Sequence, residues 1–235
     1  MMQTGRLPHD PARLAAVAPH QFQLAIPARL DRSHIPFVPG LYQNDILPDC
    51  TAAALADTAR AAAWVWTGAD IVIDPNKVRQ LYARTVGVPD DIVQLAASNG
   101  AQVLDVLGTA ATHGVDFGQQ TLLSPTWDRV DTSDVQNIAH AMLYGAAYLG
   151  ADIADADMIA KVWDKPYQPP IGDETPGSKG GHCFFAWDYE GLELGDLVRF
   201  GTWGAWQPGT WRWLLDRLSD QEAYCVRWAQ FGAPA

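Results

Sequence analysis

Residues 44–57 read NDILPDCTAAALAD and open the segment that decides the fold. From Cys50 onward the run is rich in alanine, and Leu55, Ala59 and Ala62 recur at helical spacing. Alanine is the strongest helix former, so this pattern predicts a buried helix that begins near Cys50. The N-terminus of a helix offers partial positive charge and free N–H groups, and both favour a thiolate. Cys50 is therefore a candidate nucleophile, or alternatively a small core residue of this helix.

A second candidate lies in residues 180–206, GGHCFFAWDYEGLELGDLVRFGTWGAW. His182 opens a β-type stretch directly after Gly180 and Gly181, where missing side chains allow another segment or a substrate to approach closely. A lone histidine is more often structural than catalytic. His113 and His140 fit the structural interpretation, because each falls inside a predicted helix without a partner motif.

The order of predicted elements is helices first and strands later, which is typical of an α+β fold. We expect helices over residues 74–87, 100–114 and 131–145, the last with Thr132 or Ser133 as its N-cap. Strands are expected at 147–153, 182–190, 192–203 and 222–230, with a short helix at 211–218. Six of the 16 prolines lie in residues 1–39, which predicts an extended N-terminal arm. The remainder, 40–235, is then one domain with a helical lobe (about 40–145) and a β lobe (about 146–235).

The composition excludes several classes of function. The chain has 235 residues and a formal net charge of -11, which argues against nucleic acid or an anionic membrane surface as a partner. Three cysteines at irregular spacing suggest neither a disulfide framework nor a zinc site, and no cofactor or metal is expected. We see no signal peptide and no transmembrane segment, so a cytoplasmic or virion location is expected.

Together, the two quoted stretches resemble the papain-like cysteine peptidases, in a divergent form similar to uncharacterised proteins of bacteria and their phages. That family has an amide side chain six residues before the nucleophile, and Asn44 has this position relative to Cys50. The resemblance implies that Asn44 helps to form an oxyanion hole. It also implies a two-lobed papain-like fold, with Cys50 on the helical lobe, His182 on an antiparallel, β-barrel-like lobe and the substrate between them.

The resemblance departs from the family pattern where an Asn normally orients the histidine. The family's Asn-Ser-Trp-Gly box reads Gly201-Thr202-Trp203-Gly204 here, and glycine has no side chain for that task. Thr202 is the nearest substitute, although the alternation of side chains along a strand predicts that it points to the opposite face. Asp188 is too far along the strand, at roughly 20 Å from His182.

Two further features weaken the expected chemistry. Asn44 is one carbon shorter than the family's usual Gln, which displaces a donor that must lie close to the developing charge. Asp49 is adjacent to Cys50, and a carboxylate there raises the pKa of the thiol unless its charge is used to cap the helix.

Three functions are consistent with these residues. The first is a thiol hydrolase, a peptidase or amidase, that uses the Cys50–His182 pair, in a fully active, weakened or inactive form. The second is a non-catalytic papain-fold protein, such as a virion component or assembly subunit whose arm contacts a neighbour. The third is an acyltransferase on the same pair. The partner is accordingly a peptide or protein substrate or an assembly partner. The acidic balance, together with the tryptophans near the expected cleft, favours a basic or aromatic peptide over an acidic one.

Overall fold

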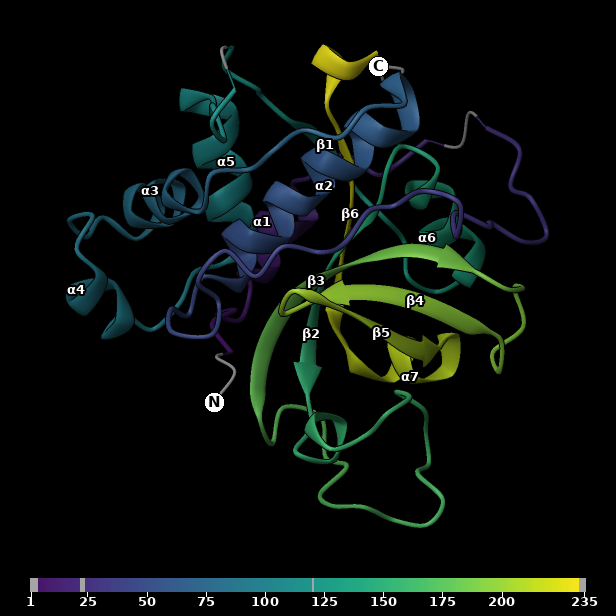
Figure 1. The fold of residues 1–235 in the computed structure, drawn as a ribbon. Helices are drawn as coiled ribbons and strands as arrows, with labels where there is room; N and C mark the ends of the chain where they lie inside the picture. The colour runs from purple at the N-terminus through teal and green to yellow at the C-terminus, as the bar shows by residue number, and fades with distance from the viewer. Residues whose placement is uncertain (1–3, 22–23, 120, 233–235) are drawn as a thin grey trace.

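The computed structural model describes residues 4–21, 24–119 and 121–232, with the backbone alone at 219–221, and Figure 1 shows how they are arranged. The helices α3, α4 and α5 gather on one side of the central helix α2, and most of the sheet lies on the other side. The α-helices are α1 (Pro11–Ala15), α2 (Cys50–Thr67), α3 (Pro75–Val86), α4 (Ile92–Ala96), α5 (Val103–His113), α6 (Val135–Met142) and α7 (Trp211–Arg217). The strands are β1 (Thr126–Arg129), β2 (Ala147–Ile153), β3 (Gly180–Tyr189), β4 (Leu197–Thr202), β5 (Ala205–Thr210) and β6 (Leu218–Arg227), and two 3₁₀ turns are η1 (Ala156–Met158) and η2 (Ala229–Phe231).

Helix α2 is the buried helix that the alanine-rich run predicted. It contacts α3 and α5 on one side and β2 and β3 on the other, and small alanine side chains allow both neighbours to approach closely. The helix ends at Gly68, whose φ of 71° suits a left-handed C-cap and whose N–H donates to the Trp64 carbonyl oxygen. Throughout the part of the chain that the structure describes, no helix combines the length and apolar character that a bilayer span requires.

The six strands form one antiparallel sheet in the order β1-β6-β2-β3-β4-β5. The α+β fold is therefore confirmed. The expected barrel-like closure is not found, because β1 and β5 are the two edges of an open sheet. Strand β5 contains Pro208, which lacks a backbone N–H, and an edge strand is where a sheet tolerates that loss.

Some local expectations need correction. Helix α6 is capped by Asp134, whose carboxylate accepts from the Gln136 N–H at 2.9 Å, so neither Thr132 nor Ser133 is its N-cap. Strands β1 and β5 were not predicted. Both β1 and α6 precede residue 146, the expected start of the β lobe. They nevertheless lie on the sheet, since β1 pairs with β6 and α6 packs against β2, β3 and β6.

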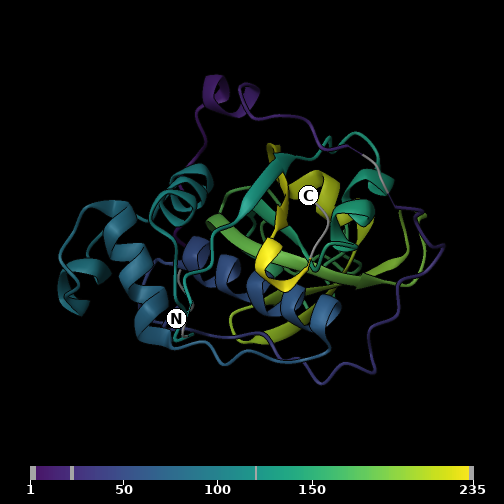
Figure 2. The same cartoon turned by 90° about the horizontal axis from the view of Figure 1, so that it is seen from above.

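The N-terminal arm is extended apart from the short helix α1, and Figure 2 shows it running around the outside of the molecule before it returns to α2. The backbone N–H of Leu30 donates to the carbonyl oxygen of Tyr189 in β3, and the N–H of Tyr189 donates to the carbonyl oxygen of Leu30. Arg32 is buried and donates to the carbonyl oxygens of Met142, Gly145 and Trp187. Its burial lowers the pKa of the guanidinium to about 10, which leaves it charged at neutral pH. The buried guanidinium of Arg32 thus fixes the arm to the sheet and to the end of α6 through hydrogen bonds to backbone carbonyl oxygens.

Candidate active site

Cys50 is the first residue of α2 and is only 1% exposed. Burial raises the pKa of its thiol to about 12, and the charge of Asp49 adds to this shift. Hydrogen bonds to the backbone of Cys183 and Gly5 act in the opposite direction but do not offset the loss of solvent. Cys50 is therefore a neutral thiol at pH 7 in this state, despite its position at a helix N-terminus.

His182 lies near the start of β3 and is 1% exposed. Its Nε2 atom is 2.6 Å from Thr202 Oγ1, and its ring stacks on Trp203 with centroids 3.9 Å apart and an interplanar angle of 16°. Its Nδ1 atom has no hydrogen-bond partner in the described part of the chain. Burial lowers the pKa of the imidazole to about 3, and the nearby charge of Arg6 lowers it further. The His182 ring is thus neutral. Its Nε2 atom is hydrogen bonded to Thr202, and its Nδ1 atom has no hydrogen-bond partner among the described residues.

Thr202, and not Gly201, occupies the position that faces the histidine. Gly201 pairs with Phe185, and a Cβ atom at Gly201 would lie 2.0 Å from the Phe185 ring, so this position has no room for a side chain. The next residue points to the other face of the sheet, which is the face that carries His182. The expectation that Thr202 faces away from His182 is wrong, because it assumed that residue 201 lies on the histidine side.

A tight turn holds the stacking partner of the histidine. Strands β4 and β5 are joined by Trp203 and Gly204, with φ angles of 46° and 74°, which is the geometry of a two-residue hairpin. This turn places the Trp203 indole against the His182 ring. Sequence reasoning used Trp203 as a landmark of the box and did not assign it to the site.

Asn44 and Asp49 are paired with each other beside Cys50. Asn44 Nδ2 donates to the Leu47 carbonyl oxygen and to Asp49 Oδ1, both at 3.1 Å. The Asp49 carboxyl makes no capping bond to α2, and burial raises its pKa to about 8. Asp49 is therefore largely protonated at neutral pH, which limits its effect on the thiol.

The site residues surround a cavity of about 10 Å³, which has room for one water at most. Cys50, Asn44, Thr202 and Trp203 line it. His182 is not among its lining residues, although two of them, Thr202 and Trp203, hold its ring. Three of the four predicted site residues thus line one small cavity, and the fourth, His182, is bound to Thr202 beside it.

The beginning of the arm passes next to Cys50, where the Gly5 backbone hydrogen bonds to the thiol, although residues 4–7 do not line this cavity. Gly5 accepts a hydrogen bond from the Ala101 N–H at 2.8 Å, and Leu7 donates to the Ala101 carbonyl oxygen at 3.0 Å. Between them, Arg6 N–H donates to the Gly181 carbonyl oxygen at 3.0 Å. The arm therefore runs as an extended strand between the helical side, at Ala101, and the sheet, at the residue before His182.

Glycines make this passage possible. A Cβ atom at Gly5 would lie 2.0 Å from the Pro48 carbonyl oxygen, and one at Gly100 would lie 1.7 Å from the Gly5 carbonyl oxygen. A Cβ atom at Gly181 would lie 2.4 Å from the Arg6 carbonyl oxygen. Sequence reasoning noted that the glycines before His182 allow close approach, but gave no indication that residues 4–7 are the segment that approaches.

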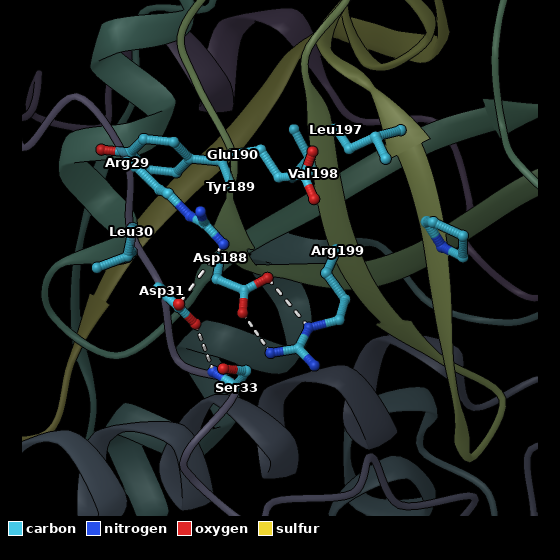
Figure 3. A pocket seen from close by; sticks show the side chains of 11 residues that line it. Arg29, Leu30, Asp31, Ser33, Asp188, Tyr189, Glu190, Leu197, Val198 and Arg199 are labelled. Atoms are coloured by element: carbon cyan, nitrogen blue, oxygen red, sulfur yellow. Dashed lines mark hydrogen bonds and ion pairs between the residues drawn. The ribbon is translucent and has the colours of Figure 1, made fainter.

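A larger pocket of about 310 Å³ lies elsewhere, where the arm crosses β3 and β4, and it shares no lining residue with the Cys50 cavity. Figure 3 shows that Asp188 and Arg199 face each other in this pocket as an ion pair. Asp188 thus has a partner away from His182, in agreement with its exclusion as the group that orients the histidine. Its lining includes neither a cysteine nor a histidine.

Comparison with known proteins adds the fold family. No protein-family model and no curated protein sequence matches the chain. Among solved structures, xylellain, a cysteine protease from Xylella fastidiosa, has a TM-score of 0.67 at 13% identity, with 96% of each chain covered. The fold is that of the papain-like cysteine proteases.

Two further structures with this fold are similar over most of the chain. The proCathepsin B S9 of Trypanosoma congolense has a TM-score of 0.65 at 8% identity and covers 96% of this chain and 86% of its own. The digestive procathepsin L 3 of Tenebrio molitor larval midgut has a TM-score of 0.61 at 10% identity and covers 97% and 74%. The papain-like fold inferred from the two quoted stretches is confirmed.

Proposed function

We propose that this protein is a thiol hydrolase, a peptidase or amidase, with Cys50 as nucleophile and His182 as base. The observation that carries the proposal is the state of the His182 ring. When Nε2–H donates to Thr202 Oγ1, Nδ1 holds the lone pair and can accept a proton. Thr202 and Trp203 then perform the positioning that a third catalytic group usually provides.

The reaction follows from these roles. The Cys50 sulfur attacks the substrate carbonyl carbon as its proton moves to His182 Nδ1, and a C–S bond forms. His182 returns the proton to the leaving amine as the C–N bond breaks. Water, deprotonated by the same nitrogen, then cleaves the thioester and restores the thiol.

Asn44 and the Cys50 N–H are the proposed donors to the oxyanion. In the structure the Asn44 amide nitrogen donates to Leu47 and Asp49. It would exchange one of these bonds for the substrate oxygen, so its contribution develops only when substrate is bound.

We further propose that the arm keeps this site latent. Residues 4–7 occupy the space between the two lobes, and burial there keeps Cys50 and His182 uncharged. In this state the Gly5 carbonyl oxygen accepts from the Ala101 N–H. Two of the similar structures are by name precursor forms, procathepsin L 3 and proCathepsin B S9, and a latent state of this chain would be comparable.

The test is to displace residues 4–7 from the cleft in the full chain. Arg6→Glu places a carboxylate against Glu222 and Asp152, which now pair with Arg6, and should expel residues 4–7. We expect this variant to hydrolyse fluorogenic peptide amides and the wild type to hydrolyse them slowly. The control Arg6→Glu/Cys50→Ala should be inactive. The proposal is wrong if iodoacetamide labels Cys50 rapidly in Arg6→Glu while no peptide, amide or ester substrate is turned over.

The same assay separates the alternatives. A non-catalytic protein gives no turnover in the opened variant, and an acyltransferase gives an amide product when a primary amine is added. The arm packs on its own chain, which supports an intramolecular role for it over a contact with a neighbouring subunit.

A further inference from the structure

Helix α2 carries a buried carboxyl group two turns beyond Cys50. Asp57 follows Cys50 by seven residues, so the two side chains share one face of the helix. Asp57 is 3% exposed and lines the same small cavity as Cys50 and Asn44. A buried carboxyl group needs hydrogen-bond donors, and the donors to Asp57 come from the segment that leads into the helix.

Hydrogen bonds hold this incoming segment against α2. The Gly40 N–H donates to Asp57 Oδ2 at 2.9 Å and to Oδ1 at 3.1 Å. The Tyr42 hydroxyl donates to Asp57 Oδ1 at 2.8 Å. Arg60, one turn further along the helix, donates to the Val38 carbonyl oxygen at 2.7 Å. Two side chains of α2 therefore fix both ends of the segment.

The segment enters a turn that needs support from its surroundings. Tyr42 and Gln43 have φ angles of 47° and 73°, in the left-handed region that residues other than glycine rarely adopt. Such a backbone persists only where surrounding contacts impose it. The Tyr42 ring lies over Gly40, because a Cβ atom there would be 1.9 Å from Tyr42 Cζ. The bonds to Asp57 thus hold both the ring and the backbone of this turn.

The turn determines where Asn44 lies. The Asn44 N–H donates to the Leu41 carbonyl oxygen at 2.8 Å, which joins Asn44 to the held segment. Leu41 also lies next to the hairpin that stacks on His182, since a Cβ atom at Gly204 would be 3.0 Å from Leu41 Cβ. The turn is therefore placed between the helix that carries Cys50 and the hairpin that holds the histidine.

We propose that Asp57 is a positioning residue for the proposed hydrolysis, which keeps the Asn44 amide beside the Cys50 sulfur. This inference rests on the proposed function, because Asn44 is the side-chain donor to the oxyanion there. A donor of this kind must be held within about 0.5 Å of its productive position by rigid neighbours. Because α2 carries both Cys50 and Asp57, one rigid helix holds the nucleophile and supports the donor. Asp57 acts through Asn44 and not on the substrate itself.

The test deletes one of these bonds in the full chain. The background is Arg6→Ala, which lacks the ion pairs to Glu222 and Asp152 that hold the arm. Rates are expressed per reactive Cys50, titrated with iodoacetamide, so that a loss of folded protein does not count. Tyr42→Phe keeps the ring and removes the hydroxyl. We expect kcat for a fluorogenic peptide amide to fall by roughly tenfold with KM unchanged, because the displaced donor acts in the transition state.

Two comparisons show whether this effect passes through Asn44. Asn44→Ala should lower kcat by about hundredfold or more, and adding Tyr42→Phe to it should lower kcat no further. Tyr189→Phe is the matched control and should leave kcat unchanged. Its hydroxyl also donates a hydrogen bond, to the Pro27 carbonyl oxygen at 2.7 Å, but Tyr189 does not line the Cys50 cavity.

Variants of the carboxyl group itself complete the series. Asp57→Ala loses both bonds, whereas Asp57→Asn keeps one acceptor oxygen, so kcat of Asp57→Asn should lie between those of Asp57→Ala and the parent. Tyr42→Phe decides the question if Asp57→Ala does not fold. The positioning role is overturned if the losses in Tyr42→Phe and Asn44→Ala multiply in the double variant, or if Tyr42→Phe behaves like Tyr189→Phe.

A failure of the hydrolase gives a different result. Absence of turnover in Arg6→Ala overturns the proposed function, and NMR spectroscopy then decides the positioning. The side-chain amide signals of Asn44, identified by their absence in Asn44→Ala, should shift in Tyr42→Phe and stay in place in Tyr189→Phe. Unchanged Asn44 signals in Tyr42→Phe would overturn the role of Asp57 as well.

Discussion

At the residue scale, the hydrogen bond between Thr202 Oγ1 and His182 Nε2 is the most direct feature to test. Thr202→Val keeps the shape of the side chain and removes the hydroxyl, which frees the ring to change tautomer and angle. In the Arg6→Ala background we expect kcat/KM for peptide hydrolysis to fall by about tenfold to hundredfold. The pH dependence of kcat/KM should shift as well, because the bond contributes to the environment of the titrating imidazole.

Thr202→Ser is the matched control, since it retains the hydroxyl and should keep most of the activity. Equal activity in Thr202→Val and the parent would show that stacking on Trp203 alone orients the ring.

Asp49 makes a second prediction at this scale, on stability. Its pKa is about 8 in the folded chain, against 3.8 for an ordinary aspartate. Between these values the unfolded chain releases a proton that the folded chain retains, so stability falls as the pH rises from about 4 to 8. Asp49→Asn should remove this pH dependence while keeping the contact with Asn44. At pH 8 the free energy of unfolding of the variant should exceed that of wild type by a few kcal/mol at most, relative to the difference at low pH.

Thermal unfolding at pH 5 and pH 8 measures this effect. The exposed Asp155→Asn serves as the control for loss of one charge and should leave the pH dependence unchanged. If the unfolding temperatures of Asp49→Asn and wild type changed in parallel between pH 5 and pH 8, Asp49 would be ionised in the folded chain.

The residues that sequence reasoning found are those with a local signal. Cys50 follows from an alanine-rich helix that begins with it, and His182 from two glycines at the start of a strand. The face on which Thr202 lies has no such signal, because it depends on the register between β3 and β4. Placing Gly201 opposite Phe185 fixes that register, and a single sequence does not reveal a pairing between strands.

At the element scale, the arm segment of residues 4–7 is held by backbone hydrogen bonds on both sides and by the fit of Gly5. Gly5→Ala would place a Cβ atom 2.0 Å from the Pro48 carbonyl oxygen. Overpacking of this kind costs about 1–3 kcal/mol, which shifts the closed state towards the open one by roughly tenfold to hundredfold. We expect iodoacetamide to label Cys50 faster by a similar factor, as followed by mass spectrometry.

The internal reference is Cys225, which is buried, does not line the Cys50 cavity and should stay slow. Gly108→Ala, in α5, is the matched substitution, because nothing lies within 4 Å of its Cβ position and alanine favours a helix. Unchanged labelling of Cys50 in Gly5→Ala would contradict a closing role for residues 4–7.

Elements with a strong period were predictable, whereas elements defined by their partners were not. α2, α3, α5 and β2 follow from helical or strand patterns with clear end signals. β5 contains Pro208 and Gly209, which argue against a strand unless its position at the sheet edge is known. The destination of the arm depends on contacts with Ala101 and Gly181, far away in sequence, so a proline-rich composition predicted only its extended form.

At the scale of the whole molecule, the arm joins parts of both lobes, and its contacts include a pair of buried histidines. His20, on the arm, has its Nε2 atom 2.7 Å from His140 Nδ1 on α6. The Leu24 N–H donates to His140 Nε2 at 3.0 Å, so His140 uses that nitrogen as an acceptor. His140 therefore donates through Nδ1 to His20, and the network requires both rings to be neutral.

Acid should weaken this contact. Burial lowers the pKa of His140 to about 4 and also lowers that of His20, against an ordinary value of 6.5. Below 6.5 the unfolded chain binds protons that the folded chain does not, so stability is fully present above pH 6.5 and falls as the pH drops towards 4. A proton on His140 Nε2 would also face the Leu24 N–H, donor against donor, and release the arm at this point.

His140→Gln, a neutral group that can still hydrogen bond, should make the loss of stability between pH 6.5 and 4 shallower, as measured by thermal unfolding. The exposed His34→Gln should follow the wild type. His182 has a lowered pKa for the same reason, so part of the dependence should persist in His140→Gln and disappear only when the cleft is opened by Arg6→Ala, which exposes that ring. An identical acid transition in wild type and His140→Gln would place the whole effect in the cleft and leave the histidine pair as a static contact.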